Sequence, residues 1–178
     1  MKKILIATLV LAIGVLYFSQ AGAKPDRKVN PYPAPKVEAV DQDGHAVKLE
    51  ELYQKGFTLV YFYPKAGTPG CTAQACSLRD AYESLTHEGV KVVGVSTDKV
   101  GSQKKFQEKN RLPFTLLADP DGKVLKAFGV GSIPLLGWAS RQAFLIKDGN
   151  VVWHDAKAST SEQAADVLEA MKEFKENK

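Results

Sequence analysis

The order of apolar and polar positions along the chain predicts alternating strands and helices. Residues 57–63 (FTLVYFY) form a continuous apolar run rich in β-branched and aromatic side chains, which is typical of a buried central strand, and the valine-rich residues 90–95 predict a second buried strand. Residues 71–86 repeat apolar positions at helical spacing, residues 102–110 are typical of a charged surface helix, and residues 161–175 form an amphipathic C-terminal helix. The pattern therefore predicts a sheet covered by helices.

Two predicted hairpins and two short elements complete this picture. Each hairpin surrounds a turn sequence, DQDG at 41–44 or KDGN at 147–150. A strand–helix–strand order followed by a hairpin and a final helix indicates an α/β class with a mixed central sheet flanked by helices, as in the thioredoxin-like fold. The hairpin strands are residues 36–40 with 45–49 and 143–146 with 151–153, and the short elements are a strand at 114–117 and a helix at 122–128.

The first 23 residues resemble an export signal. Lys2 and Lys3 precede an uncharged apolar segment, and Ala21-Gly22-Ala23 has the small-residue pattern of a signal peptidase site. If the segment is not cleaved, its uncharged length of 20 residues from Ile4 to Ala23 is just enough for a membrane anchor. Both interpretations place the domain outside the cytoplasmic membrane, in the periplasm or on the outer face of that membrane. Membrane contact is expected only for the uncleaved form.

The remainder of the chain is interpreted as one domain preceded by a linker. Residues 24–36 contain four prolines and predict an extended linker, so the domain spans residues 37–178. The net charge of +4 is mild, and no basic block occurs in the sequence. This charge pattern argues against a nucleic-acid-binding function.

The chemistry of the sequence is concentrated around its two cysteines, Cys71 and Cys76. Cys71 lies where a loop rich in glycine and proline enters the helix predicted at 71–86. The start of a helix presents free N–H groups and the positive end of the helix dipole, and both favour a thiolate over a thiol. Because the thiolate is the nucleophilic form, Cys71 is a candidate for redox chemistry.

Cys76 lies five residues further along the same predicted helix. This spacing corresponds to about 7.5 Å of rise and roughly 140° of rotation, whereas a disulfide needs Cα atoms within about 7 Å and facing side chains. We therefore expect the first turns of the helix to unwind if Cys71 and Cys76 bond to each other. Two alternatives are a purely structural disulfide and a metal site. The latter is disfavoured because Cys-x4-Cys and the scattered His45, His87 and His154 lack the paired spacing of zinc ligands.

The sequence around Cys71 resembles the active site of the peroxiredoxins. Pro64-x-x-x-Thr68-x-x-Cys71 matches their pattern, and the longer segment YPKAGTPGCTAQACSLRD at 63–80 is similar to the peroxiredoxin Q or bacterioferritin comigratory protein subgroup. The resemblance extends from about residue 37 to the C-terminal helix. Three further segments carry it, namely 94–98 (GVSTD), 113–119 (PFTLLAD) and 141–146 (RQAFLI).

This resemblance implies a thiol-dependent peroxidase that acts on hydrogen peroxide and alkyl hydroperoxides without a bound cofactor. It assigns Cys71 as the peroxidatic and Cys76 as the resolving cysteine. Thr68 is expected beside the sulfur, Pro64 as a shield against water, and Arg141 as a cation that favours the thiolate. The family further implies a Cys71–Cys76 disulfide, a thioredoxin-like protein reductant and a monomer. An exported enzyme would need such a reductant to be supplied through the membrane.

Two features depart from the family pattern, and two other functions remain as alternatives. Position 143 is Ala, where the family has Ser or Thr, and the apolar segment 131–138 (GSIPLLGW) could wall the pocket, favour bulkier hydroperoxides or face another subunit. A thiol–disulfide oxidoreductase on the same fold is disfavoured because no Cys-x-x-Cys is present. The second alternative is a non-enzymatic domain with a structural disulfide.

Overall fold

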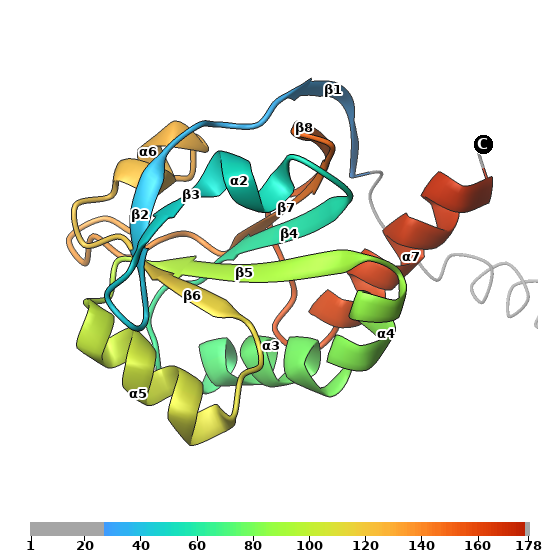
Figure 1. Cartoon of the computed structure of the whole chain (residues 1–178). Coiled ribbons are helices and arrows are strands. Elements are labelled where there is room, and N and C mark those ends of the chain that lie inside the picture. Colours follow the sequence, from blue (N-terminus) through green and yellow to red (C-terminus); the bar gives the residue numbers. More distant parts are fainter. Residues whose placement is uncertain (1–26, 177–178) are drawn as a thin grey trace, which may run out of the picture.

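The computed structural model describes residues 27–176, which form an eight-stranded mixed sheet with helices on both faces (Figure 1). The spatial order of the strands is β1-β8-β7-β4-β5-β6-β2-β3. The strands are β1 (Lys28–Pro33), β2 (Glu38–Asp41), β3 (Ala46–Lys48), β4 (Phe57–Phe62), β5 (Val90–Ser96), β6 (Thr115–Ala118), β7 (Gln142–Lys147) and β8 (Asn150–Asp155). The helices are α2 (Leu49–Tyr53), α3 (Pro69–Asp80), α4 (Tyr82–His87), α5 (Val100–Asn110), α6 (Lys123–Ala127) and α7 (Gln163–Glu176).

The centre of the sheet is formed by three parallel strands, β4, β5 and β6. Residues 58–62 of β4 are all buried, because this strand has neighbours on both sides and helices over both faces. The parallel connections cross over through helices, α3 and α4 between β4 and β5, and α5 between β5 and β6. The remaining strand pairs are antiparallel.

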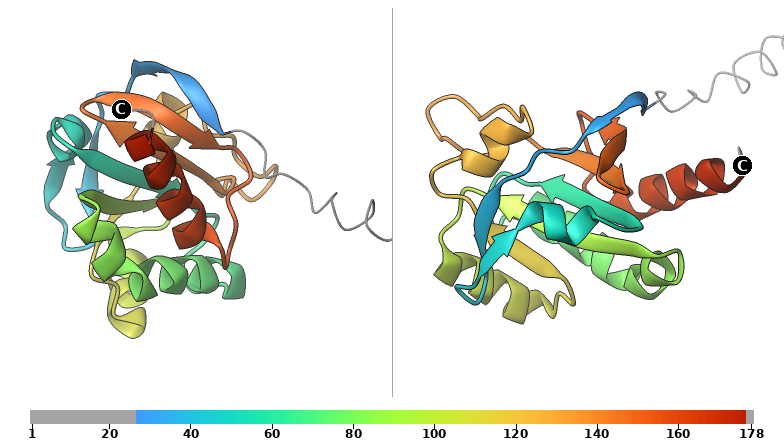
Figure 2. Two further views of the ribbon diagram at one scale, coloured as in Figure 1. Left: turned by 90° about the vertical axis from the view of Figure 1, so that its right-hand side faces the viewer. Right: turned by 45° about the horizontal axis from the view of Figure 1, so that its top comes forward.

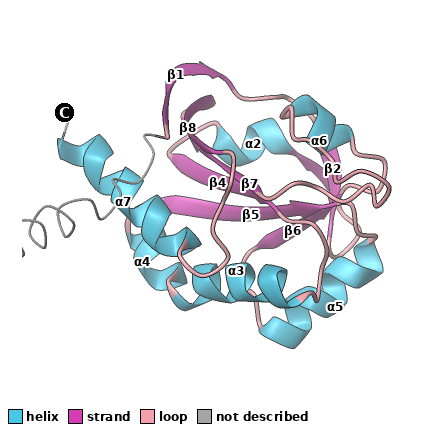
Figure 3. Cartoon of the chain, turned by 180° about the vertical axis from the view of Figure 1, so that it is seen from behind, coloured by secondary structure: helices cyan, strands magenta, loops and turns pink. Residues whose placement is uncertain are grey.

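The helices divide into two layers with a separate apolar core on each face of the sheet. Figures 1 and 3 show α3, α4 and α5 below the sheet and α2 and α6 above it, with α7 on the side of α3 and α4. The lower core contains Cys71 together with Leu85 of α4, Phe106 of α5 and Met171 of α7. The part of α3 that carries Cys71 is thus packed into the core and does not lie on a surface loop. This arrangement confirms the predicted mixed sheet flanked by helices.

Both predicted hairpins are confirmed, as β2–β3 and β7–β8, but the helix predicted at 71–86 differs from the structure. Pro69 occupies the first helical position, so α3 begins two residues before Cys71. The fixed φ of proline suits this position, where its missing N–H would have no helical partner. The helical segment then breaks at Ala81 (φ −98°, ψ 9°), and α4 follows as a separate turn.

The predicted linker at 24–36 contains an ordered strand instead. Residues 28–33 form β1, which pairs antiparallel with β8 at the edge of the sheet (Figure 2). Proline is tolerated in an edge strand because one side of its backbone needs no ladder hydrogen bond. Arg27 fastens this strand, with Nε 3.1 Å from Asp155 Oδ2 and Nη1 3.1 Å from Asp166 Oδ1.

The short helix α2 was not predicted, since its five residues offer no helical period to recognise. The predictions for residues 1–23, a signal peptide or an anchor, lie outside the described residues. Within residues 27–176, no helix has the length and apolar character needed to cross a bilayer.

Candidate active site

The loop between β4 and α3 is held in shape by hydrogen bonds to a neighbouring strand connection. The N–H of Ala66 donates to Asp98 Oδ2 (2.7 Å), and the same oxygen accepts from Ser96 Oγ (2.8 Å) at the end of β5. Gly67 has φ +79°, a conformation that favours glycine. The hydroxyl of Thr68 donates to the carbonyl of Lys65 (3.0 Å). The loop therefore delivers the chain to the start of α3 in one defined conformation.

Cys71 lies at the third position of α3 and is almost completely buried, with 1% of its surface exposed. Thr68 occupies the N-cap position without a side-chain cap, and its carbonyl accepts the first helical hydrogen bond from Thr72 N (2.9 Å). The N–H groups of Gly70 and Cys71 precede that bond and have no partner within the helix. The sulfur therefore sits at the positive end of α3, as predicted.

Arg141 immediately precedes β7 and reaches the sulfur from the adjacent part of the sheet. Its Nη2 donates to Cys71 Sγ at 3.4 Å, which is hydrogen-bonding distance for sulfur. The guanidinium packs closely over Gly70, since a Cβ built there would lie 3.4 Å from Arg141 Nη2. The structure thus brings together Cys71 and Arg141 as the resemblance implied.

The other predicted site residues are placed nearby with less direct roles. Pro64 is half-buried at the start of the loop, directly after Tyr63. Thr68 is three residues before the sulfur, with its hydroxyl engaged by Lys65. Their predicted parts, in shielding the sulfur and contacting the peroxide, stay predictions.

Cys76 lies further along α3, half-buried, and both cysteines are free thiols. The intervening helix is intact, so an ideal helical rise of about 7.5 Å separates the two Cα atoms. Beyond it, Arg79 pairs with Asp80 at 2.7 Å and donates to the Asn110 carbonyl at 2.8 Å. The ion pair with Asp80 lies within α3, whereas the bond to the Asn110 carbonyl joins the end of α3 to the end of α5.

Two glutamines near Arg141, Gln74 and Gln163, are site residues that the sequence did not predict. Gln74 Oε1 accepts from Arg141 Nη1 (2.5 Å), and Gln74 Nε2 donates to Gln163 Oε1 of α7 (2.9 Å). Both glutamine side chains are fully buried. Gln74 could have been found from its spacing, since position i+3 from Cys71 lies on the same helix face. No local signal identifies Gln163, which is 89 residues away from Gln74.

Ala143, the position that departs from the family pattern, is fully buried beside Tyr61 in the β4–β7 register. Its methyl group offers no hydrogen bond, so Arg141 is held by the Gln74 amide rather than by a hydroxyl at position 143. The function of that missing hydroxyl is therefore replaced or unnecessary in this chain.

Two buried tyrosines, Tyr61 and Tyr63, lie on the face of the sheet that α3 covers. They belong to the same apolar core as Cys71. Burial raises the pKa of Tyr61 and the pKa of Tyr63 well above the ordinary value for a phenol. The Tyr63 hydroxyl donates to Gln103 Oε1, whereas the Tyr61 hydroxyl has no partner among the described residues. Both therefore remain neutral at physiological pH and serve as packing under the thiol.

The apolar segment 131–138 forms a small closed loop beside the active-site loop. Ser132 pairs with Ala139 as an isolated bridge, and the Lys65 ammonium lies 5.0 Å from the centroid of the Trp138 ring. Leu135 is fully exposed at φ +65°, and Leu136 is also exposed. A fully exposed side chain does not line a buried sulfur, so Leu135 is not part of the wall around Cys71.

The histidines do not contact the thiols. His45 and His87 are exposed, whereas His154 is half-buried and stacks on Phe144 at 4.2 Å between ring centroids. His45 forms a carboxylate cluster with Asp41 and Asp43, all within one surface turn. That turn is held by hydrogen bonds from the backbone to Asp41, so its geometry needs no metal ion.

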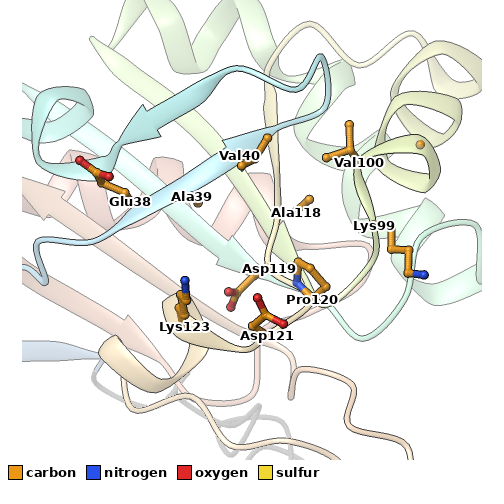
Figure 4. Close-up of a pocket in the computed structure, with 11 residues that line it drawn as sticks. Glu38, Ala39, Val40, Lys99, Val100, Ala118, Asp119, Pro120, Asp121 and Lys123 are labelled. Carbon is orange, nitrogen blue, oxygen red and sulfur yellow. The ribbon is translucent and has the colours of Figure 1, made fainter.

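A separate pocket of about 390 Å³ opens between β2 and the starts of α5 and α6 (Figure 4). Its lining mixes the lysines Lys99 and Lys123 with Asp119 and Asp121, and the apolar part includes Val40 and Val100. Burial raises the pKa of the Asp119 carboxyl, which accepts from the Leu125 N–H at 2.9 Å. None of the predicted site residues lines this pocket.

Comparisons with known proteins agree with the geometry around Cys71. Residues 32–154 match the family described as AhpC/TSA. The chain is 48% identical over 134 residues to peroxiredoxin Bcp of Escherichia coli K12, covering 71% of this chain and 85% of that protein. It is 43% identical over 124 residues to chloroplastic peroxiredoxin Q of Oryza sativa subsp. japonica, covering 67% and 54%, respectively.

Solved structures that superpose on this chain are also peroxiredoxins. Peroxidoxin BcpB of Mycobacterium tuberculosis superposes with a TM-score of 0.75 at 32% identity, covering 83% of this chain and 97% of that one. The bacterioferritin comigratory protein of Xanthomonas campestris, described for its alkyl peroxide reduction activity, gives a TM-score of 0.73 at 27% identity and coverages of 84% and 99%.

Proposed function

This chain belongs to the AhpC/TSA family and is a thiol-dependent peroxidase, and from this premise we propose that Cys71 is the residue that attacks the peroxide. The observation that carries the assignment is the 3.4 Å contact between Arg141 Nη2 and the Cys71 sulfur at the start of α3. The cation and the helix dipole both favour the thiolate. Cys76 lies beyond the first turn of α3, and the arginine beside it, Arg79, is engaged by Asp80 and by the Asn110 carbonyl.

The first chemical step transfers one oxygen atom. The Cys71 thiolate attacks one peroxide oxygen, the O–O bond breaks, and the leaving oxygen takes a proton to become water or an alcohol. The sulfur is oxidised to a sulfenic acid while the peroxide is reduced. The Arg141 guanidinium stabilises the negative charge as it moves from sulfur to the leaving oxygen, and Thr68 and Pro64 complete the surroundings of the peroxide.

Cys76 resolves the sulfenic acid in the second step. Its thiolate attacks the Cys71 sulfur, the S–O bond breaks, and the hydroxide released takes a proton to form water. The product is a Cys71–Cys76 disulfide, which requires the first turns of α3 to unwind because both cysteines lie on the intact helix. A dithiol then reduces this bond by thiol–disulfide exchange.

The enzyme takes a peroxide and a thiol reductant. We propose that the peroxides are hydrogen peroxide and alkyl hydroperoxides, that the reductant is a thioredoxin-like protein, and that the protein acts as a monomer. The similarity to the Xanthomonas campestris bacterioferritin comigratory protein, described for its alkyl peroxide reduction activity, supports the alkyl hydroperoxide assignment. A coupled assay that follows NADPH consumption through thioredoxin and its reductase tests the reductant, and sedimentation of the reduced protein tests the monomer.

We also propose that the chain is exported to the periplasm, or held on the outer face of the cytoplasmic membrane if its N-terminal segment is not cleaved. Lys2 and Lys3, the apolar run after them and the Ala21-Gly22-Ala23 pattern support this location. Fusion of residues 1–36 to alkaline phosphatase, which is active only outside the cytoplasm, tests it. An inactive fusion would refute export.

Rapid mixing of the reduced protein with hydrogen peroxide tests the catalytic assignment. We expect fast loss of both thiols, consumption of one peroxide per chain, and a product two mass units lighter that contains an intramolecular disulfide. Cys71→Ser should abolish the fast phase. A thiol that reacts no faster than an ordinary free cysteine, or a Cys71→Ser variant that retains the fast phase, would refute the assignment.

A further inference from the structure

A series of buried and partly buried hydrogen bonds connects the C-terminal helix α7 to the sulfur of Cys71. Arg141 Nη2 donates to Cys71 Sγ, and Arg141 Nη1 donates to Gln74 Oε1 at 2.5 Å. Gln74 Nε2 then donates to Gln163 Oε1 at 2.9 Å. Both glutamines have no exposed surface, so water does not replace either bond.

The chemistry of the side chains fixes which atom donates and which accepts in each of these hydrogen bonds. A guanidinium has only donors, so Gln74 must present its oxygen to Arg141. The Gln74 nitrogen then faces away and needs an acceptor, which Gln163 Oε1 supplies. A rotated Gln74 amide would set nitrogen against the guanidinium, placing donors against donors. An acceptor at position 163 therefore stabilises the same orientation of the Gln74 amide that the arginine requires.

From this arrangement we propose that Gln163 is a positioning residue that holds Arg141 on the Cys71 sulfur by fixing the orientation of the Gln74 amide. The inference rests on the proposed roles of Cys71 and Arg141. Ala143 adds weight, because the neighbouring strand position offers the arginine no hydroxyl. The Gln74 amide is thus the acceptor that orients the second nitrogen of the guanidinium.

Packing alone does not account for a glutamine at position 163. Its Nε2 is buried and has no partner among the described residues, and an unpaired buried donor is unfavourable. Methionine would fill a similar volume without an unpaired polar atom. The retained amide is explained by its oxygen, which serves Gln74.

The segment that carries Gln163 is itself fastened to the site. The Ala158 N–H donates to the Arg141 carbonyl (3.3 Å), and the Ala164 N–H donates to Ser77 Oγ of α3 (3.4 Å). A Cβ built at Gly70 would lie 3.4 Å from Thr160 Cγ2. The start of α7 therefore lies against both the arginine segment and the reactive helix, which gives the Gln163 side chain a fixed position.

The test compares two substitutions in the full chain. Gln163→Met removes the acceptor at nearly constant volume, whereas Gln163→Glu keeps an acceptor oxygen. We expect Gln163→Met to slow Cys71 oxidation by hydrogen peroxide about fivefold or more, because a misplaced cation stabilises the charge that moves during the attack less well. Gln163→Glu should stay within about threefold of the parent protein.

A double-mutant cycle with Gln74→Met separates this role from a structural one. If Gln163 acts through Gln74, the Gln163→Met substitution adds no further loss in the Gln74→Met background. Met171→Ala, a buried change on the same helix, should lower thermal stability without altering the rate of Cys71 oxidation. Gln163→Ala replaces the methionine variant if that variant does not fold.

Three results would overturn the proposal. These are an unchanged oxidation rate in Gln163→Met, a full additional loss of rate in the Gln74→Met background, or an equal slowing in Met171→Ala. A slow Arg141 variant together with a silent Gln163→Met would leave the peroxidase mechanism intact and reject only the positioning role. A Cys71→Ser variant with full activity would instead reject the mechanism.

Discussion

The guanidinium of Arg141 donates a hydrogen bond to the sulfur of Cys71, 3.4 Å away, although 70 residues separate them in the chain. Arg141 lies immediately before β7. Cys71 lies in the first turn of α3, the helix that follows β4 in the sequence. The β4–β7 pairing, with Phe62 opposite Gln142, fixes how far apart these two positions lie. The sheet register therefore determines the geometry of the thiol.

Replacing this arginine by lysine is expected to slow the first oxidation about 100-fold. Lysine keeps the charge but cannot bond the sulfur and the Gln74 amide through two nitrogens of a planar group. The measurement is the rate of Cys71 oxidation by hydrogen peroxide under single-turnover conditions. Arg79→Lys is the control, because Arg79 lies on α3, where it pairs with Asp80 and lies beside Cys76 rather than Cys71. Equal rates for the Arg141→Lys variant and the parent would remove Arg141 from the site.

Cys76→Ser should separate the two chemical steps. Cys71 still attacks the peroxide at its normal rate, but the sulfenic acid has no neighbouring thiol to condense with. Mass spectrometry should then find a chain heavier by one oxygen, and turnover with a thioredoxin-type reductant should stop or fall sharply. Normal turnover in this variant would show that Cys76 is not the resolving residue.

Gly94 on β5 is expected to tolerate no side chain. A Cβ there would lie 2.7 Å from Leu116 Cδ2 and 2.8 Å from the Tyr61 hydroxyl, within the fully buried core beneath α3. Gly94→Ala should therefore lower the free energy of unfolding by about 1–3 kcal/mol. Gly101→Ala is the control, since nothing lies within 4 Å of its Cβ position, and it should be neutral or stabilising by up to about 0.5 kcal/mol. Urea unfolding measures both.

His154 should make the fold sensitive to mild acid. Burial against Phe144 lowers the pKa of His154 below its ordinary value of 6.5, so the unfolded chain binds a proton more readily than the folded one. Stability is therefore lost as the pH falls below the unfolded value of about 6.5, and the loss stops growing below the folded pKa. Unfolding free energies between about pH 5 and 7 should fall less steeply in His154→Phe than in the parent. His87→Gln, at an exposed position, should keep the parent slope.

Much of the fold follows from local pattern, and the exceptions have physical causes. The apolar run at 57–63 and the turn sequences at 41–44 and 147–150 predict β4 and the two hairpins correctly. Strand β1 was taken for a linker because its prolines are unfavourable inside a sheet but permissible at an edge. Its partner β8 lies over a hundred residues away, and no local feature announces such a pairing.

The site shows the same division. Cys71 and Arg141 were predicted through a family pattern, and their contact confirms that they meet. Gln74 has an informative position one turn after the cysteine, but its amide could equally have faced solvent. Gln163 became visible only when α7 was seen against α3, because an isolated glutamine near a helix start carries no signal of burial.

Because both cysteines lie on α3, the stability of this helix also contributes to the free energy of disulfide reduction. If the proposed Cys71–Cys76 disulfide unwinds α3, reduction lets the helix re-form and recover its packing against the sheet and α7. Every contact that stabilises intact α3 then makes the disulfide easier to reduce. Each loss of about 1.4 kcal/mol of such packing on oxidation makes the disulfide about 30 mV more oxidising. The Gln74–Gln163 bond, the Ser77 contact and the core packing of Leu78 thus tune the reduction potential of the enzyme from outside its sulfur chemistry.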